Sequence, residues 1–101
     1  MSAREFFDAL PARADRDQIV GIENSYLFDI EGEGRWLVSL SGGAVTVTED
    51  PTEPGDVTIA TTAQVFDRIV AGEQNPAVAV MTGKIKLTGE TGAALKLQKL
   101  F

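Results

Sequence analysis

The stretch MTGKIKLTG, residues 81–89, decides how the second half of the chain folds. Within it, Lys84 and Lys86 alternate with Ile85 and Leu87, and a period of two is typical of a β-strand with one wet face and one buried face. One glycine precedes the alternation and another follows it. The strand is therefore expected to be short and to turn sharply at both ends.

Four upstream segments alternate in the same way. Three of them, 25–30, 35–40 and 44–49, are separated by the glycine-containing turns EGEG and SGG and predict an antiparallel meander. An acidic loop over residues 50–56 then leads to a fourth strand at 57–62. The side chains expected to face inward from the meander are Tyr26, Phe28, Ile30, Trp36, Val38, Leu40, Val45 and Val47.

Two helices are expected before the meander. Ser2 and Glu5 form an S-x-x-E capping box at the start of a helix over residues 3–10, which Pro11 is expected to end. A second short helix is expected around residues 15–20.

Three more helices are expected in the second half of the chain. Thr62 can cap a helix over residues 63–71 that ends at a glycine. Asn75 and Pro76 occupy the N-cap and first-turn positions of a short apolar helix. The final helix is expected over residues 90–101, after the fifth strand.

Length and charge limit the classes of protein. A chain of 101 residues with 44% apolar side chains is expected to form one soluble domain, residues 1–101. The net charge of −6 argues against nucleic-acid binding, because phosphate contacts need a basic surface. The charge is uneven: residues 1–75 contain 14 acidic and five basic side chains, whereas residues 76–101 contain four lysines and one acid.

Catalytic chemistry is not visible in the sequence. The chain contains no cysteine and no histidine, which removes disulfides, thiolate nucleophiles and imidazole chemistry. The closest acidic pairs lack the further ligands and fixed glycine of a calcium loop and are interpreted as solvated turn residues. We therefore expect no enzyme activity, no metal and no cofactor. No apolar run is long enough to span a membrane, and the N-terminus is charged where a secretory signal would be apolar, so a cytoplasmic location is expected.

Apolar side chains are abundant after residue 57, and two interpretations remain open. They can simply form the core, which is the commoner situation for apolar stripes on helices and strands. Alternatively, some of them line a cavity. The set comprises Phe66, Ile69, Val70, Val78, Met81, Ile85, Leu87, Leu97, Leu100 and Phe101.

The order of these segments resembles the sterol carrier protein type two family. The resemblance is carried by FFDALP, by YLFDIEGEGRWLVSLSGGAVTV and by DVTIATTAQVFDRIVAGEQNPAVAVMTGKIKLTGE, and it covers nearly the whole chain. It implies a mixed α/β (α+β) single domain with five strands in one sheet, in which a three-strand antiparallel meander is followed by a crossover and helices cover one face.

The resemblance also implies a function. Members hold a lipid, such as a fatty acid, an acyl-CoA or a sterol, in an apolar tunnel between sheet and helices, and they have no catalytic residues of their own. The ten apolar residues above are then expected to line the tunnel. Ile85 and Leu87 would face it, and Lys84 and Lys86 would face the other side of the sheet.

Two functional hypotheses follow. The first is a lipid-binding module that transfers or presents lipid. The second is an accessory subunit of a lipid or lipid-soluble-cofactor pathway, or a self-associating dimer whose groove is filled by protein; Leu95 and Phe101 favour it. The expected partners are a lipid or fatty-acyl ligand and, through Lys96 and Lys99, weak contact with an anionic membrane surface. The chain is expected to be a monomer or a homodimer.

Overall fold

The structure is a computed structural model, and it describes residues 3–13, 16–53, 55–90 and 92. Most of the helix expected over residues 90–101 lies outside these ranges. The elements, in chain order, are α1 (Ala3–Arg13), α2 (Arg16–Ile19), β1 (Ser25–Glu31), β2 (Gly34–Ser41), β3 (Ala44–Glu49), β4 (Val57–Thr62), α3 (Ala63–Val70), α4 (Pro76–Met81) and β5 (Lys86–Gly89).

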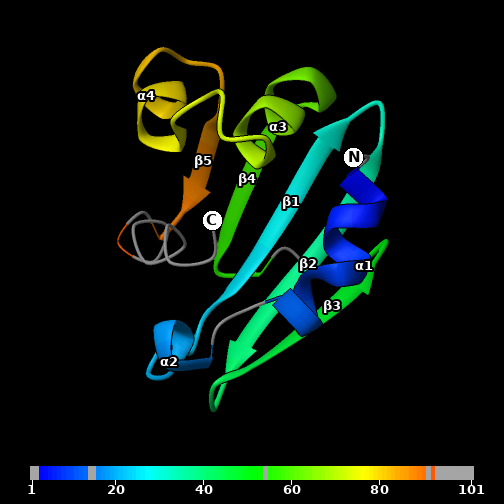
Figure 1. Cartoon of the computed structure of the whole chain (residues 1–101), viewed down its shortest axis with the longest axis vertical. Helices are drawn as coiled ribbons and strands as arrows, with labels where there is room; N and C mark the ends of the chain where they lie inside the picture. Colours follow the sequence, from blue (N-terminus) through cyan, green and yellow to red (C-terminus); the bar gives the residue numbers. More distant parts are fainter. Residues whose placement is uncertain (1–2, 14–15, 54, 91, 93–101) are drawn as a thin grey trace.

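The five strands form one mixed sheet in the order β3-β2-β1-β4-β5. The neighbours are antiparallel except for β1 and β4, which are parallel because the chain crosses from the β3 edge to the far side of β1. Phe28 lies near the middle of this sheet, paired with Trp36 on one side and Ile59 on the other. Helices α1 and α3 lie over the same face of the sheet (Figure 1). The expected α+β class, meander and crossover are confirmed.

The core is aromatic and lies between α1, α3 and the sheet. Phe7, on α1, is fully buried and its ring stacks on Trp36 at a centroid distance of 4.8 Å and on Phe66 at 5.4 Å. Phe28 completes the group, with its ring 5.1 Å from that of Phe7. These rings join the meander to the second half of the fold, because Phe66 belongs to α3.

The opposite face of the sheet is partly covered by the connection from β3 to β4. Leu27 points to this face, between two inward-facing neighbours, yet it is only 2% exposed. A Cβ added to Gly55 would lie 2.9 Å from Cδ1 of Leu37, so the connection passes close over the sheet here. The crossover therefore buries apolar surface that the helices do not reach.

Two boundaries differ from the sequence-based expectations. Helix α1 continues through Pro11 to Arg13. The proline is accommodated near the end of the helix, although its ring removes one i→i−4 hydrogen bond and crowds the carbonyl of the residue four positions earlier. Strand β5 begins at Lys86, later than expected, because the amides of Lys84 and Ile85 both donate to the carbonyl oxygen of Ala79 instead of joining the sheet.

Candidate functional site

Helix α3 places an apolar stripe over the sheet. It begins at Thr62, whose Oγ1 accepts a hydrogen bond from the amide of Val65 at 3.2 Å, as expected for an N-cap. It ends in a Schellman turn, in which Glu73 N–H donates to the carbonyl of Arg68 and Gly72 has a φ of +79°. Both ends match the positions expected from the sequence.

Helix α4 is short and well capped. The Asn75 side chain accepts from the amide of Ala77 at 2.8 Å and from that of Val78 at 3.3 Å, and Pro76 occupies the first turn. A second Schellman turn ends the helix, with Gly83 at a φ of +79°. The chain therefore reverses within a few residues from α4 into β5.

One polar contact ties this reversal to the sheet. The side chain of Thr61 is buried, and its Oγ1 donates to the carbonyl oxygen of Lys84 at 2.9 Å. Its hydrogen-bonding capacity is therefore satisfied within the fold. The contact helps to position Ile85, which is buried and directly precedes β5.

Five of the ten predicted lipid-contacting residues lie in or against the core. Phe66, Ile69 and Ile85 are buried, and Val70 and Leu87 are partly buried and pack against the same cluster. Leu87 pairs with Ile59 across β4 and β5. These side chains form one apolar layer between α3 and the β4–β5 end of the sheet. Their role in contacting lipid stays a prediction.

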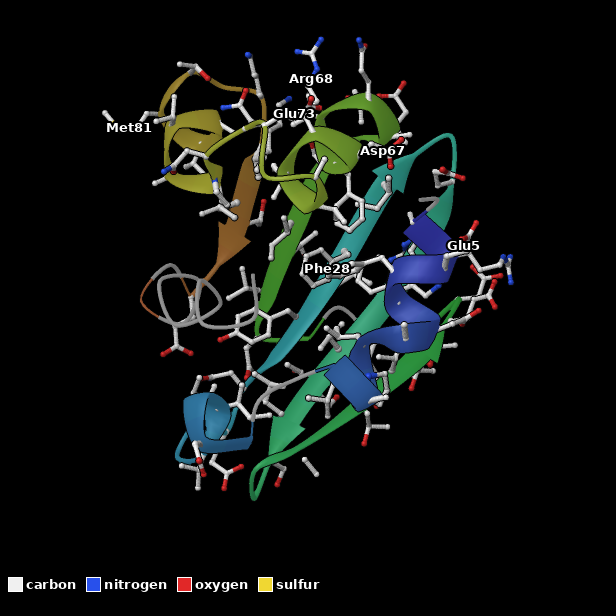
Figure 2. All side chains as sticks on the ribbon, viewed as in Figure 1. Glu5, Phe28, Asp67, Arg68, Glu73 and Met81 are labelled. Atoms are coloured by element: carbon white, nitrogen blue, oxygen red, sulfur yellow. The ribbon has the colours of Figure 1, made fainter. Side chains whose placement is uncertain are left out.

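Two of the other five predicted residues lie outside this layer. Met81 is 86% exposed and Val78 is 48% exposed, so neither lies within the apolar layer of the structure. Met81 projects away from the body of the molecule (Figure 2). Leu97, Leu100 and Phe101 lie outside the described residues.

Asp56 has a structural role that the sequence did not indicate. Its Oδ2 accepts hydrogen bonds from the amide of Ser25 at 3.0 Å and from Nδ2 of Asn24 at 3.2 Å, and its carbonyl accepts from the amide of Glu90 at 3.1 Å. It thus joins the starts of β1 and β4 to the end of β5. Burial, followed by the charges of Asp56 and Glu90, raises the pKa of the neighbouring Tyr26.

Acidic side chains and a surface cavity are further candidate site features among the described residues. The described residues contain no group of three or more acidic side chains placed to hold a metal ion. A surface cavity of about 500 Å³ lies beside α3, and its lining combines the polar side chains of Asp67, Arg68 and Glu73 (Figure 2) with the apolar side chains of Val70 and Ala71.

The fold and its apolar layer define a small α+β domain with a sheet on one side and helices on the other. The SCP-2 sterol transfer family model matches residues 5–101. The chain belongs to this family, whose domains bind and transfer lipids and are generally non-catalytic.

Curated relatives contain the domain within longer chains. Human hydroxysteroid dehydrogenase-like protein 2 is 32% identical over 103 residues, which cover 98% of this chain and 24% of the relative. The Xenopus tropicalis protein of the same name is 30% identical over 100 residues, which cover 96% of this chain and 24% of the relative. The chain thus spans about a quarter of the length of these relatives.

Solved structures agree on the fold. The sterol carrier protein domain 2 of Helicoverpa armigera has a TM-score of 0.78 at 26% identity, covering 95% of this chain and 82% of that one. The sec-alkylsulfatase Pisa1 from Pseudomonas sp. has a TM-score of 0.83 at 27% identity, covering 99% of this chain but 16% of that one. Palmitated SCP2L2 from Aedes aegypti has a TM-score of 0.80 at 22% identity, covering 96% of this chain and 91% of that one.

Within the described ranges, no helix combines the length and apolar character needed to cross a bilayer.

Proposed function

We propose that this domain binds a long-chain lipid, such as a fatty acid, an acyl-CoA or a sterol-like molecule, in an apolar tunnel between its sheet and helices, without catalysing a reaction. The observation that carries the proposal is the apolar layer between α3 and the β4–β5 end of the sheet. Phe66, Ile69 and Ile85 are its buried members, and Val70 and Leu87 are partly buried and pack against the same cluster. The palmitated relative from Aedes aegypti supports an acyl ligand.

Apolar burial alone is sufficient for useful affinity. Each buried methylene contributes about 0.8 kcal/mol, so an acyl chain of roughly 12 to 16 methylenes gains about 10–13 kcal/mol before costs. Lost ligand freedom removes several kcal/mol, which leaves binding on the order of micromolar. The lack of a buried polar anchor in the described apolar layer is compatible with this affinity.

The test is a titration with fatty acids of increasing length. Affinity is expected to rise with each pair of methylenes, because each pair adds buried apolar area. Val70→Asn, which places an amide at the margin of the layer, is expected to weaken binding, whereas Ala71→Asn, one residue on and exposed, is the matched control. An affinity that does not depend on chain length would rule out the tunnel.

A second function is favoured by the relatives. In the dehydrogenase-like and sulfatase proteins the domain is 24% and 16% of the chain, so it can serve as an accessory part beside an enzyme domain. We propose this role as the alternative. Native mass spectrometry of protein purified from cells separates the two: co-purified lipid supports the carrier, and a lipid-free dimer or a complex with an enzyme supports the accessory role.

The remaining proposals concern the cellular location and the oligomeric state of the protein. We propose that the protein is cytoplasmic and that it is a monomer or a homodimer. The same native mass spectra report the oligomeric state. Cell fractionation tests the location, and recovery of the protein in a secreted fraction would contradict it.

A further inference from the structure

Helix α4 has an apolar surface that faces solvent. All six of its residues, Pro76–Met81, are apolar, yet only Ala79 is buried. Val78 and Met81 are one turn apart and lie on the same side of the helix, at 48% and 86% exposure. A short helix on a protein surface normally presents polar residues to water, so this face is an exception that points to a binding partner.

Contacts at both ends of α4 fix the orientation that exposes this face. Ala79 is 0% exposed and turns one side of the helix inward, and the Asn75 cap and the Gly83 turn fix both ends. The contact from Thr61 to the carbonyl of Lys84 holds the segment that follows. Because these contacts set the rotation of the helix, Val78 and Met81 point outward.

The segment that carries this face has charges of one sign only. Residues 74–89 contain two lysines and no acidic side chain, whereas the whole chain has a net charge of −6; Glu73 and Glu90 flank the segment. Lys84 lies beside the start of α4, because its Nζ donates to Oε1 of Gln74 at 3.4 Å. Lys86 is also exposed, on the first residue of β5. An apolar face with cations at its margin is complementary to an anionic lipid surface.

We propose that Val78 and Met81 insert into the interface of an anionic bilayer and that Lys84 contacts the lipid headgroups. In this arrangement α4 is a docking surface, and these two residues contact membrane lipid instead of lining the tunnel. The contact is weak and reversible, because two side chains and one or two cations fall far short of a stable membrane anchor.

The first experiment measures binding to vesicles. Wild-type protein is sedimented with phosphatidylcholine vesicles that contain or lack phosphatidylserine. Met81→Ser is expected to lower the partition coefficient about tenfold, since it removes one large inserted side chain. Val20→Ser is the matched control, because Val20 is also apolar and 59% exposed but lies just after α2. Equal partitioning of wild type and Met81→Ser would overturn the proposal.

The second experiment tests the electrostatic part. Lys84→Gln is expected to lower binding to phosphatidylserine vesicles about fivefold at low salt, and the difference is expected to shrink at high salt. Binding that is independent of phosphatidylserine would contradict the choice of an anionic surface.

A third variant keeps the proposal testable if a serine substitution impairs folding. In Met81→Trp, brominated lipids are expected to quench the new tryptophan, and in Val20→Trp they are not. A tryptophan at 81 that is already shielded from iodide without vesicles would show that the chain itself covers this face. A dimer that Met81→Ser disrupts would show that a second copy does. Either result would overturn the proposal.

The proposed docking surface and the proposed lipid tunnel can be refuted independently of each other. If the wild type takes up no free fatty acid but binds vesicles through Met81, the proposed ligand is wrong and the docking surface stands. If it binds fatty acid and no variant changes vesicle binding, the docking surface is wrong and the proposed function stands.

Discussion

Truncation of Phe7 is expected to be among the most destabilising single changes in this fold. Phe7→Ala removes a fully buried ring whose centroid lies 4.8 Å from that of Trp36, 5.1 Å from that of Phe28 and 5.4 Å from that of Phe66. The lost side chain leaves a void of about 100 Å³ if nothing collapses, and at about 24 cal/mol per Å³ this void alone costs roughly 2.4 kcal/mol. With the lost transfer free energy, a total of about 3–5 kcal/mol is expected.

That loss is large relative to the stability of the whole domain. A domain of this size has a free energy of unfolding of roughly 5–15 kcal/mol, so Phe7→Ala is expected to leave the protein marginally folded. The measurement is urea unfolding followed by the fluorescence of Trp36, with the melting temperature as a second reading. A fall in melting temperature of more than about 10 °C is expected, at roughly 4–8 °C per kcal/mol.

Two further variants decide whether the rings are responsible. Phe7→Leu keeps most of the volume and is expected to cost clearly less than Phe7→Ala, because the void is smaller. Leu10→Ala removes a buried, non-aromatic side chain from the same helix and gives the ordinary cost of core truncation. If Phe7→Ala costs less than about 1.5 kcal/mol, below the usual range for truncating a buried phenylalanine, the rings do not link α1 to α3 as described.

Three other outcomes are expected. Trp36, 2% exposed, should emit at short wavelength in the native protein and shift to the red on unfolding; a red native spectrum would mean that the register of β2 is wrong by one residue. Gly89→Ala should cost several kcal/mol of unfolding free energy, because Gly89 has a φ of +106° and an added Cβ would collide with the carbonyl of Asp56; an unchanged denaturation midpoint would contradict this. The pKa of Tyr26 is raised, so its neutral form is favoured in the folded state, and the resulting stability should be present below pH ~10 and lost as the pH rises through the folded-state pKa. Tyr26→Phe should remove that part of the alkaline loss, and an identical pH profile in both proteins would refute the assignment.

The strands were predictable because their signal is local. Alternation located β3 and β4 at their observed bounds and the first two strands to within one residue, and the glycine turns located the reversals between them. The caps at Thr62 and Asn75 were equally readable, because the capping hydrogen bond involves residues two or three apart.

What could not be predicted depends on contacts between distant residues. Leu27 is buried on the face opposite to α1 and α3, and Gly55 of the β3–β4 connection approaches Leu37 closely; no pattern near either leucine in the sequence indicates this. Likewise, a run of apolar residues predicts a buried helix, and only the rotation of α4 shows that Met81 points outward. The lipid site itself was expected from resemblance to a family, since an apolar lining has no residue pattern that separates it from an ordinary core.

The parallel pairing of β1 with β4 has a consequence for synthesis on the ribosome. Strands β1 to β3 are neighbours in the sequence and can pair soon after they emerge, because only short loops have to close. β1 acquires its second neighbour only when β4 emerges, and the aromatic core stays incomplete until Phe66 follows. We therefore expect a nascent chain that has exposed only residues 1–56 to present an unpaired edge of β1 and a half-covered ring of Phe7, which makes it a substrate for chaperones until the fourth strand closes the sheet.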